Sequence, residues 1–301
     1  MQKTTVLITG GTGFIGANLA RRLVQDGRDV HVVTTLHGNR DILGDIADLV
    51  TLHIHDGSSE GMKDLVGTVK PAVVFHLASL FLSEHSTEQI EPLIRSNLLF
   101  GTQLVDAMAA CGSGLLVNTG TSWEHYRGMA YSPVNLYAAT KQAFEAILQY
   151  YVEARELRVV TLKLFDTYGA NDPRAKLFTL LRRVAEQGMP LAMSPGEQLI
   201  DLVHVDDVVE AFCLAAGRLL EGAVTGHERY AVSSGAPLPL RELVALYGRV
   251  IGKDLPIEWG GRPYRQREVM VPWSSGRPLP GWQPQVGLEE GIRRMESTGS
   301  F

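Results

Sequence analysis

Residues 4–16, TTVLITGGTGFIG, constrain the fold more than any other stretch of the chain. Residues 4–9 form a short apolar, β-branched run, which predicts a buried strand. Gly10, Gly13 and Gly16 follow, and a helix is expected over 17–26. In this arrangement Gly10 permits a tight turn, Gly13 lets the backbone approach a phosphate, and Gly16 lets the helix pack on the strand. Free N–H groups at the helix N-terminus favour an anion, so the stretch predicts a pyrophosphate cradle for a nucleotide.

The first half of the chain alternates strand and helix patterns. We expect further strands at 30–34, 50–54, 73–77, 115–118 and 159–164, and helices near 60–69, 91–111 and 135–155. This alternation predicts an α/β fold with a Rossmann-type, doubly wound parallel sheet. Residues 1–165 are expected to form the dinucleotide-binding domain. Residues 166–301 are expected to form a smaller substrate-binding region, with about 200–232 returning to the first domain and 274–287 as an extended surface loop.

Composition narrows the class of protein. The formal net charge of −5 over 301 residues gives no indication of a nucleic-acid surface. Cys111 and Cys213 have no metal-ligand spacing and suggest no disulfide framework, so we expect no metal site and a reducing, cytoplasmic location. No apolar run approaches the roughly 20 residues of a membrane helix, and the N-terminus lacks the pattern of a signal peptide.

The end of the second strand bears on the choice of dinucleotide. NAD enzymes usually place a carboxylate there, against the ribose 2′-hydroxyl. This chain has Thr34, Thr35 and Arg40, which can hold a 2′-phosphate. The sequence therefore favours NADP, although NAD remains possible and Arg40 could be a solvated loop charge. Asp56, after the third strand, could accept from the adenine amino group or simply cap a turn.

A second motif suggests proton transfer. Tyr137 and Lys141 in YAATK lie one helical turn apart on the same face. A tyrosine can protonate a carbonyl oxygen when its pKa is lowered, and we expect the Lys141 ammonium to lower it. Thr121 and Ser122 follow the fifth strand, and residues at the carboxyl ends of parallel strands face the ligand crevice.

Several segments in one order point to a family. They are TGGTGFIG, FHLAS at 75–79, RSNLLFGT at 95–102, YAATK, LFDTYG at 164–169 and DLVHVDDVV at 201–209. Over essentially its whole length the chain resembles an extended short-chain dehydrogenase/reductase of the sugar-nucleotide epimerase/dehydratase type. NTGTSWEHY, SPVNLYAATKQAFE and WGGRPYRQREVMVPW are most similar to nucleotide-linked 4-keto-6-deoxysugar reductases, of the CDP-abequose and CDP-paratose synthase type.

The resemblance assigns roles to individual residues. It implies that Thr121, with Ser122 as the alternative, is the catalytic hydroxyl, Tyr137 the acid, and Lys141 its partner and a ligand of the nicotinamide ribose. Further cofactor contacts are implied for Gly10, Gly13, Phe14, Ile15, Leu77, Ala78, Ser79, Phe165 and Thr167. Substrate contacts are implied for Thr121, Ser122, Trp123, Asp166 and either Arg262 or Arg265, the last two as alternatives for the substrate diphosphate. Asn97 matches a residue that is usually structural.

Departures from the family pattern refine the expected reaction. The 4,6-dehydratases carry Asp-Glu directly after the catalytic threonine, where this chain has Ser122 and Trp123. Asp166 replaces a frequent Asn, and Ile200 replaces a frequent Arg, which puts two substrate contacts in doubt.

The resemblance therefore implies an enzyme that uses NADPH to reduce the C4 ketone of a CDP- or dTDP-linked 4-keto-6-deoxyhexose. An NAD-dependent nucleotide-sugar C4 epimerase is the alternative enzyme, and a non-catalytic dinucleotide sensor is the alternative of another class. A homodimer is expected, paired through 91–111 and 135–155.

Overall fold

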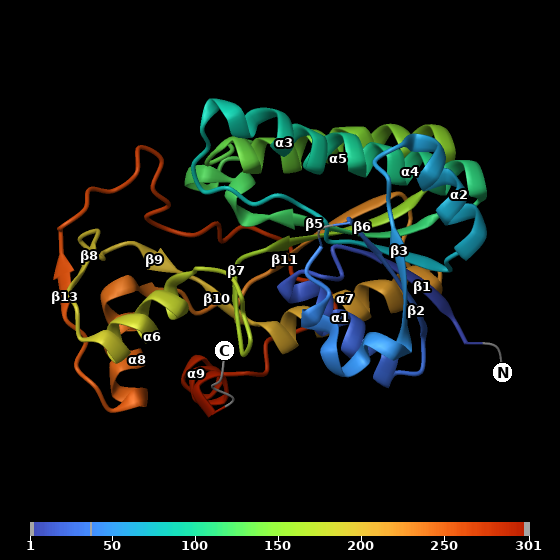
Figure 1. Cartoon of the computed structure of the whole chain (residues 1–301). Helices are drawn as coiled ribbons and strands as arrows, with labels where there is room; N and C mark the ends of the chain where they lie inside the picture. Colours follow the sequence, from blue (N-terminus) through green and yellow to red (C-terminus); the bar gives the residue numbers. More distant parts are fainter. Residues whose placement is uncertain (1–2, 37, 298–301) are drawn as a thin grey trace.

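The fold is built on one central sheet in the computed structural model of the chain, which describes residues 3–36 and 38–297 (Figure 1). Seven parallel strands lie in the order β11-β6-β5-β4-β1-β2-β3. They are β1 (Thr5–Thr9), β2 (Asp29–Thr34), β3 (Val50–Ile54), β4 (Val73–His76), β5 (Leu115–Thr121), β6 (Arg158–Leu164) and β11 (His227–Val232). The predicted Rossmann-type α/β class is confirmed.

Helices cover both faces of this sheet (Figure 1). One layer contains α2 (Ser59–Val69), α3 (Ile90–Ile94), α4 (Phe100–Cys111) and α5 (Leu136–Arg155); the other contains α1 (Phe14–Gln25), the 3₁₀ helix η1 (Asp41–Leu49) and α7 (Val205–Leu220). Successive strand residues point to opposite faces, so Val6 and Ile8 join one hydrophobic core while Leu7 joins the other. Within the described ranges, no helix is long and apolar enough to cross a membrane.

The strand order creates a switch point beside β1. The chain runs from β1 to β2 and β3 on one side, and from β4 through β5 and β6 to β11 on the other. The loops that follow β1 and β4 therefore diverge and leave a crevice at the carboxyl ends of these strands, where ligands bind in open α/β sheets. The glycine-rich residues 10–16 follow β1, and residues 77–79 follow β4.

The helix expected over 91–111 is interrupted. α3 ends at Ile94, residues Arg95–Leu99 form a π-helical turn, and α4 begins at Phe100. The side chain of Asn97, in this turn, bonds to Ser79, to both backbone polar groups of Leu80 and to Thr140. π-Turns inside α-helices often occur at functional sites. Here the turn fixes the loop after β4 to α5, as the structural role of Asn97 predicts.

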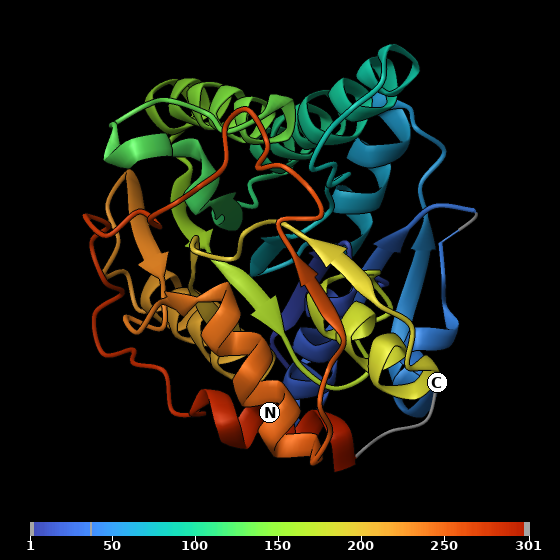
Figure 2. The same ribbon diagram turned by 90° about the vertical axis from the view of Figure 1, so that its left-hand side faces the viewer.

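The rest of the C-terminal half forms a smaller region at one end of the sheet (Figure 1), and Figure 2 shows this region facing the viewer. It contains α6 (Leu177–Gln187), α8 (Leu240–Ile251), α9 (Leu288–Ser297) and six short strands around a separate apolar cluster. The short strands are β7 (Asp166–Tyr168), β8 (Leu191–Met193), β9 (Leu199–Ile200), β10 (Leu202–His204), β12 (Leu238–Pro239) and β13 (Ile257–Trp259).

The segment 274–287 is extended, as expected, but only part of it lies at the surface. Leu279 and Trp282 are buried. The indole N–H of Trp282 donates to the Asp207 carbonyl, and the Asp207 carboxylate accepts the backbone N–H groups of Gln285 and Val286. This segment is therefore anchored to α7.

Candidate active site

The glycine-rich loop is shaped for an anion. Gly10 has a φ of +73°, and a Cβ there would lie 2.5 Å from the Ala78 nitrogen. A Cβ on Gly16 would lie 2.1 Å from the Gly10 carbonyl oxygen, so this turn admits no side chain at either position. Gly13 is the N-cap of α1 and offers no side-chain cap, and the first turn has no acidic residue. The N-terminal N–H groups of α1 are therefore suited to a phosphate.

Thr121 lies at the end of β5 and also caps the 3₁₀ helix η4 (Ser122–Glu124). Its hydroxyl accepts the N–H of Trp123 at 3.3 Å, and its own N–H donates to Oε1 of Glu124 at 2.9 Å. This capping box fixes the backbone at the position predicted for the catalytic hydroxyl. The Thr121 hydroxyl hydrogen remains available to donate to a ligand.

Tyr137 and Lys141 lie in the first turns of α5. Asn135 caps this helix through the N–H of Ala138, while its amide group donates to the carbonyls of Leu82 and Ser83. The Tyr137 ring is partly buried and lies edge-on to Phe81, with ring centroids 4.9 Å apart. Lys141 is buried. The N-cap thus aligns the beginning of α5 with the loop after β4.

The pKa of Tyr137 is shifted in the direction opposite to the one expected from its pairing with Lys141. Burial raises the pKa of Tyr137, with a further contribution from Glu124, and the groups that lower it are Ser79 and Arg174 rather than Lys141. Burial lowers the pKa of Lys141 to about 8, against the opposing effect of Glu124 and Glu145. Desolvation disfavours the charged form of each group, so burial opposes both the phenolate and the ammonium.

A first cavity of about 220 Å³ connects the glycine loop with this catalytic set. Its lining includes Gly10, Gly13, Phe14, Ile15, Leu77 and Ser79 at the loop end, and Thr121, Ser122, Trp123, Tyr137, Lys141, Phe165, Asp166 and Thr167 at the other. Ala78 instead packs against Gly10. An anion cradle at one end and hydroxyl groups at the other fit a nicotinamide dinucleotide.

The residues predicted to choose between NADP and NAD lie outside that lining. Thr34 is buried, with its hydroxyl oxygen 3.4 Å from that of Thr12. Thr35 and Arg40 are exposed beyond the end of β2. Asp56 is exposed and its carboxylate accepts the backbone N–H and hydroxyl of Ser58, which lower its pKa. These bonds correspond to the second role predicted for Asp56, that of capping a turn.

A second cavity, of about 320 Å³, shares part of its wall with the first. Ser122, Trp123, Phe165, Asp166, Thr167, Phe81 and Lys176 line both. Two ligands bound in the two cavities would therefore meet at this shared wall, and Tyr137 lines the first cavity only. Of the two predicted arginines, Arg265 lines the second cavity and Arg262 does not.

Sequence reasoning missed several groups of the second cavity. Arg267 lies over the Tyr126 ring at 4.2 Å and donates to Ser132, and His125 stacks on Trp273 with ring centroids 3.9 Å apart. These residues lie far apart in the chain, which hides their proximity. In the sequence, only the aromatic residues within 123–126 and the arginines within 262–267 indicate these groups of the second cavity.

Known proteins resemble this chain over most of its length. The model of the NAD dependent epimerase/dehydratase family matches residues 6–228. A UDP-glucose 4-epimerase of Mycolicibacterium smegmatis is 30% identical, covering 96% of both chains. A CDP-abequose synthase of Yersinia pseudotuberculosis is 25% identical over 89% of this chain and 91% of its own. The structure of the Thermus thermophilus UDP-glucose 4-epimerase in complex with NAD superposes with a TM-score of 0.82 at 26% identity, covering 97% of this chain and 98% of the other.

Proposed function

Since the chain belongs to the NAD-dependent epimerase/dehydratase family, we propose that it uses NADPH to reduce the C4 ketone of a nucleoside-diphosphate 4-keto-6-deoxyhexose. The family consists of extended short-chain dehydrogenase/reductase enzymes that act on nucleotide sugars, and this chain is one of them. The two cavities with a common wall carry the proposal: Thr121, Tyr137 and Lys141 line the cavity that contains the glycine loop, and this cavity shares Ser122 and Trp123 with the second one.

When bound, the reduced dinucleotide supplies the hydride that the C4 carbonyl carbon accepts. Tyr137 donates its phenolic proton to the carbonyl oxygen, which becomes a hydroxyl group, and is reprotonated from solvent. Thr121 donates a hydrogen bond to the same oxygen. Because the N–H of Trp123 already bonds to the Thr121 oxygen, this hydroxyl is held in place before the substrate arrives. Lys141 holds the ribose and places positive charge near the developing anion.

Burial makes the Tyr137 phenol a weaker acid than expected from the sequence, so its raised pKa accounts for the presence of the proton and not for its transfer. The phenol stays protonated at neutral pH in the free protein. Tyr137 therefore carries its phenolic proton before a ketone binds.

The substrate end supports a nucleoside diphosphate. Arg265 lines the second cavity, with its guanidinium 6.0 Å from the centre of the Trp123 ring, and Arg267 lines the same wall. Guanidinium groups are suited to diphosphate oxygens, which they can bond in pairs. The CDP-abequose synthases among the relatives support a deoxysugar substrate.

Two features argue against a dehydratase activity, in which the sugar would lose water. At positions 122 and 123, where 4,6-dehydratases carry Asp-Glu, the wall shared by both cavities has a serine and a tryptophan. The nearby Glu124 is fully buried and paired with Lys163. A carboxylate held in this way is a poor base for a proton at C5.

A C4 epimerase is the second candidate. It is favoured by the UDP-glucose 4-epimerase relative at 30% identity and by a structural neighbour that binds NAD. An epimerase would return the hydride to the opposite face of the same sugar and would need no external reductant. Thr34 and Thr35, in place of a carboxylate after β2, favour NADPH instead.

One experiment separates these two functions. The purified protein is given NADPH with CDP- or dTDP-4-keto-6-deoxyglucose, and separately UDP-glucose with NAD. We expect NADPH oxidation and a new C4 hydroxyl, detected by NMR, in the first mixture, and no UDP-galactose in the second. Interconversion of UDP-glucose and UDP-galactose without NADPH oxidation would establish the epimerase. Formation of a 4-keto-6-deoxy product from nucleotide-glucose would overturn both.

A further inference from the structure

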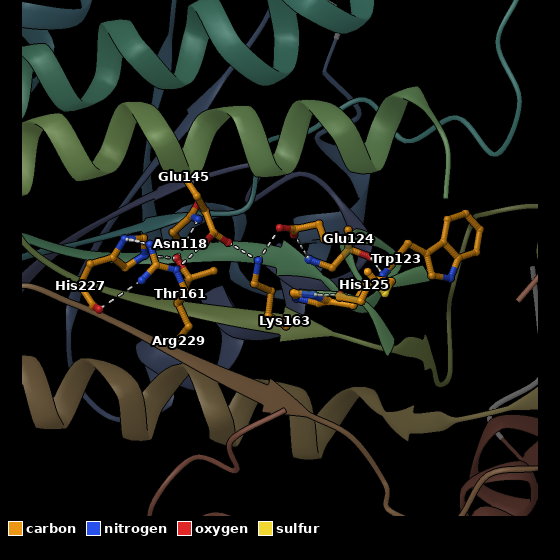
Figure 3. Close-up of polar contacts among 11 residues, drawn as sticks. Asn118, Trp123, Glu124, His125, Glu145, Thr161, Lys163, His227 and Arg229 are labelled. Carbon is orange, nitrogen blue, oxygen red and sulfur yellow. Dashed lines mark hydrogen bonds and ion pairs between the residues drawn. The ribbon is translucent and has the colours of Figure 1, made fainter. Parts of the chain in front are cut away.

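A buried ion cluster contacts the backbone of Thr121 and takes no direct part in the proposed proton transfer. Figure 3 shows its members Glu124, Glu145, Lys163 and Arg229. The ammonium group of Lys163, on β6, is bonded to the carboxylates of Glu124 and Glu145. The side chains of these three residues are 3%, 0% and 2% exposed. Arg229 on β11 bonds the other oxygen of Glu145 at 2.7 Å and is 43% exposed. The cluster therefore extends from the edge of the sheet to Glu124, beside the active site.

Glu124 links this cluster to Thr121. One carboxylate oxygen accepts the Thr121 N–H and the other bonds to Lys163. The backbone around Glu124 is also fixed, because its carbonyl accepts the N–H of Ser132. A Cβ on Gly120 would lie 2.8 Å from Cδ of Lys163 and 3.2 Å from Oε1 of Glu124. The glycine thus provides the space in which the two charged side chains meet.

We propose that Glu124 is a positioning residue of the active site: its buried carboxylate fixes the backbone of Thr121 and stabilises the positive charge of Lys141. The inference rests on the proposed function, since it assumes that Thr121 and Lys141 act in catalysis. Glu124 touches neither ligand cavity, so its effect is exerted through these two residues.

Lys141 and Glu145 are buried one turn apart on α5, and Glu145 shares Lys163 with Glu124, so this geometry places Lys141 next to the cluster. The charges around Lys141 support the same role. Burial lowers its pKa to about 8, and Glu124 is the largest opposing influence, followed by Glu145. Burial raises the pKa of Glu124 to about 7, although Lys163 and the Thr121 N–H lower it. Glu124 therefore carries its charge above about pH 7, in the range where Lys141 would otherwise lose its proton.

Other titratable groups also influence the charge of Lys141, together with Glu124. Lys163 opposes the charge of Lys141, and Glu145 supports it. The groups that face the cluster from neighbouring elements are His125 in the loop after η4, Tyr137 and Glu145 on α5, Lys163 on β6, and His227 and Arg229 on β11. Burial lowers the pKa values of both histidines, that of His227 to about 4, so neither adds positive charge at neutral pH.

The first test uses the unmodified protein and needs no substrate. The ¹⁵N–¹H signal of the Thr121 amide is followed from pH 5.5 to 9, an interval that spans the expected titration of Glu124. We expect its chemical shift to change with a midpoint near 7, the pKa of Glu124. If the Thr121 shift changes neither between these limits nor in Glu124→Gln, the Thr121 N–H does not sense this carboxylate and the inference is overturned.

The second test compares Glu124→Gln with a matched control. Glutamine keeps an acceptor for the Thr121 N–H and removes the charge. In ¹³Cε spectra of lysine, with Lys141 assigned through Lys141→Arg, the pKa of Lys141 should fall by roughly one unit. Glu228→Gln, which neutralises a carboxylate paired with Arg218 and bonded by Tyr230, should leave it unchanged. An unchanged Lys141 pKa in folded Glu124→Gln would refute the proposal.

Kinetics provide the functional measurement. Activity of the reductase needs a charged Lys141, so kcat/KM should fall as pH rises through the pKa of Lys141. In Glu124→Gln that loss should begin roughly one pH unit lower, with KM for NADPH unchanged at pH 7. If both NMR titrations succeed but no ketone is reduced, the assigned reaction is wrong and the electrostatic link stands. If the ketone is reduced and the pH profile does not move, the link is wrong.

Discussion

At the scale of single residues, the Tyr137 hydroxyl carries the proposed chemistry. Tyr137→Phe removes the proton donor and leaves a ring of the same shape against Phe81. We expect turnover of the 4-keto sugar to fall on the order of 10²–10⁴-fold, the usual contribution of a positioned general acid. The Kd for NADPH, measured by fluorescence, should stay close to that of the wild type.

The matched control for this substitution is Tyr151→Phe, which removes a hydroxyl on the same helix, bonded to Asp106 away from the cavities. It should retain full turnover. Equal activity of Tyr137→Phe and the wild type would mean that another group donates the proton.

Thr34 is the residue on which the choice of cofactor is predicted to depend. It is buried at the end of β2, beside the Thr12 hydroxyl. Thr34→Asp should place a negative charge where we expect the 2′-phosphate, and so lower kcat/KM for NADPH relative to NADH. Thr34→Asn, similar in size but uncharged, separates the effect of charge from that of shape. A wild-type enzyme that prefers NADH would contradict the assignment of NADP.

At the scale of elements, the β1–loop–α1 unit depends on glycine for steric reasons. Gly16→Ala would bring a Cβ to 2.1 Å from the Gly10 carbonyl oxygen, which is backbone and cannot move aside cheaply. The loop must therefore open, and the anion cradle is lost. We expect binding of NADPH, measured by calorimetry, to weaken by at least about tenfold, roughly 1.4 kcal/mol.

Gly217→Ala is the control for Gly16→Ala, because a Cβ on Gly217, within α7, would meet nothing within 4 Å. It should leave NADPH binding intact and stabilise the fold by roughly 0.5–1 kcal/mol. Tight NADPH binding by Gly16→Ala would show that the phosphate lies elsewhere.

At the scale of the whole molecule, the layer formed by α3, α4 and α5 bears the predicted dimer contact. Large apolar side chains are exposed on this layer: Ile94 on α3 at 38%, Leu99 in the π-helical turn before α4 at 43%, and Tyr150 on α5 at 56%. Pairing of this layer with that of a second copy would cover them and give a two-fold, four-helix interface. Light scattering at micromolar concentration should give the mass of two 32.9-kDa chains.

The double substitution Ile94→Glu/Tyr150→Glu should shift this assembly to monomers, because it introduces like charges into the contact. Met189→Glu, which changes a 60% exposed side chain just after α6, should remain dimeric. A wild-type protein that is monomeric would contradict the prediction.

The sequence alone determined those features that depend on near neighbours in the chain. The glycine spacing at 10–16 specified a turn before a helix, because steric and dipole effects act within a few residues. The strand and helix periods specified the parallel sheet, and the four-residue spacing put Tyr137 and Lys141 on one face of α5. Six of the seven central strands were predicted at nearly their observed positions.

Only the tertiary structure decided features that depend on distant contacts. The sequence placed about 200–232 with the first domain, but it did not predict that β11, within this range, is a strand that joins the central sheet through β6. Lys163 lies 39 residues from Glu124, and their pairing arises because adjacent strands and α5 bring them together in a buried space. Burial of Tyr137 raises its pKa, whereas the sequence led us to expect a lowered one. Desolvation depends on all the groups packed around the phenol and not only on Lys141 one turn away.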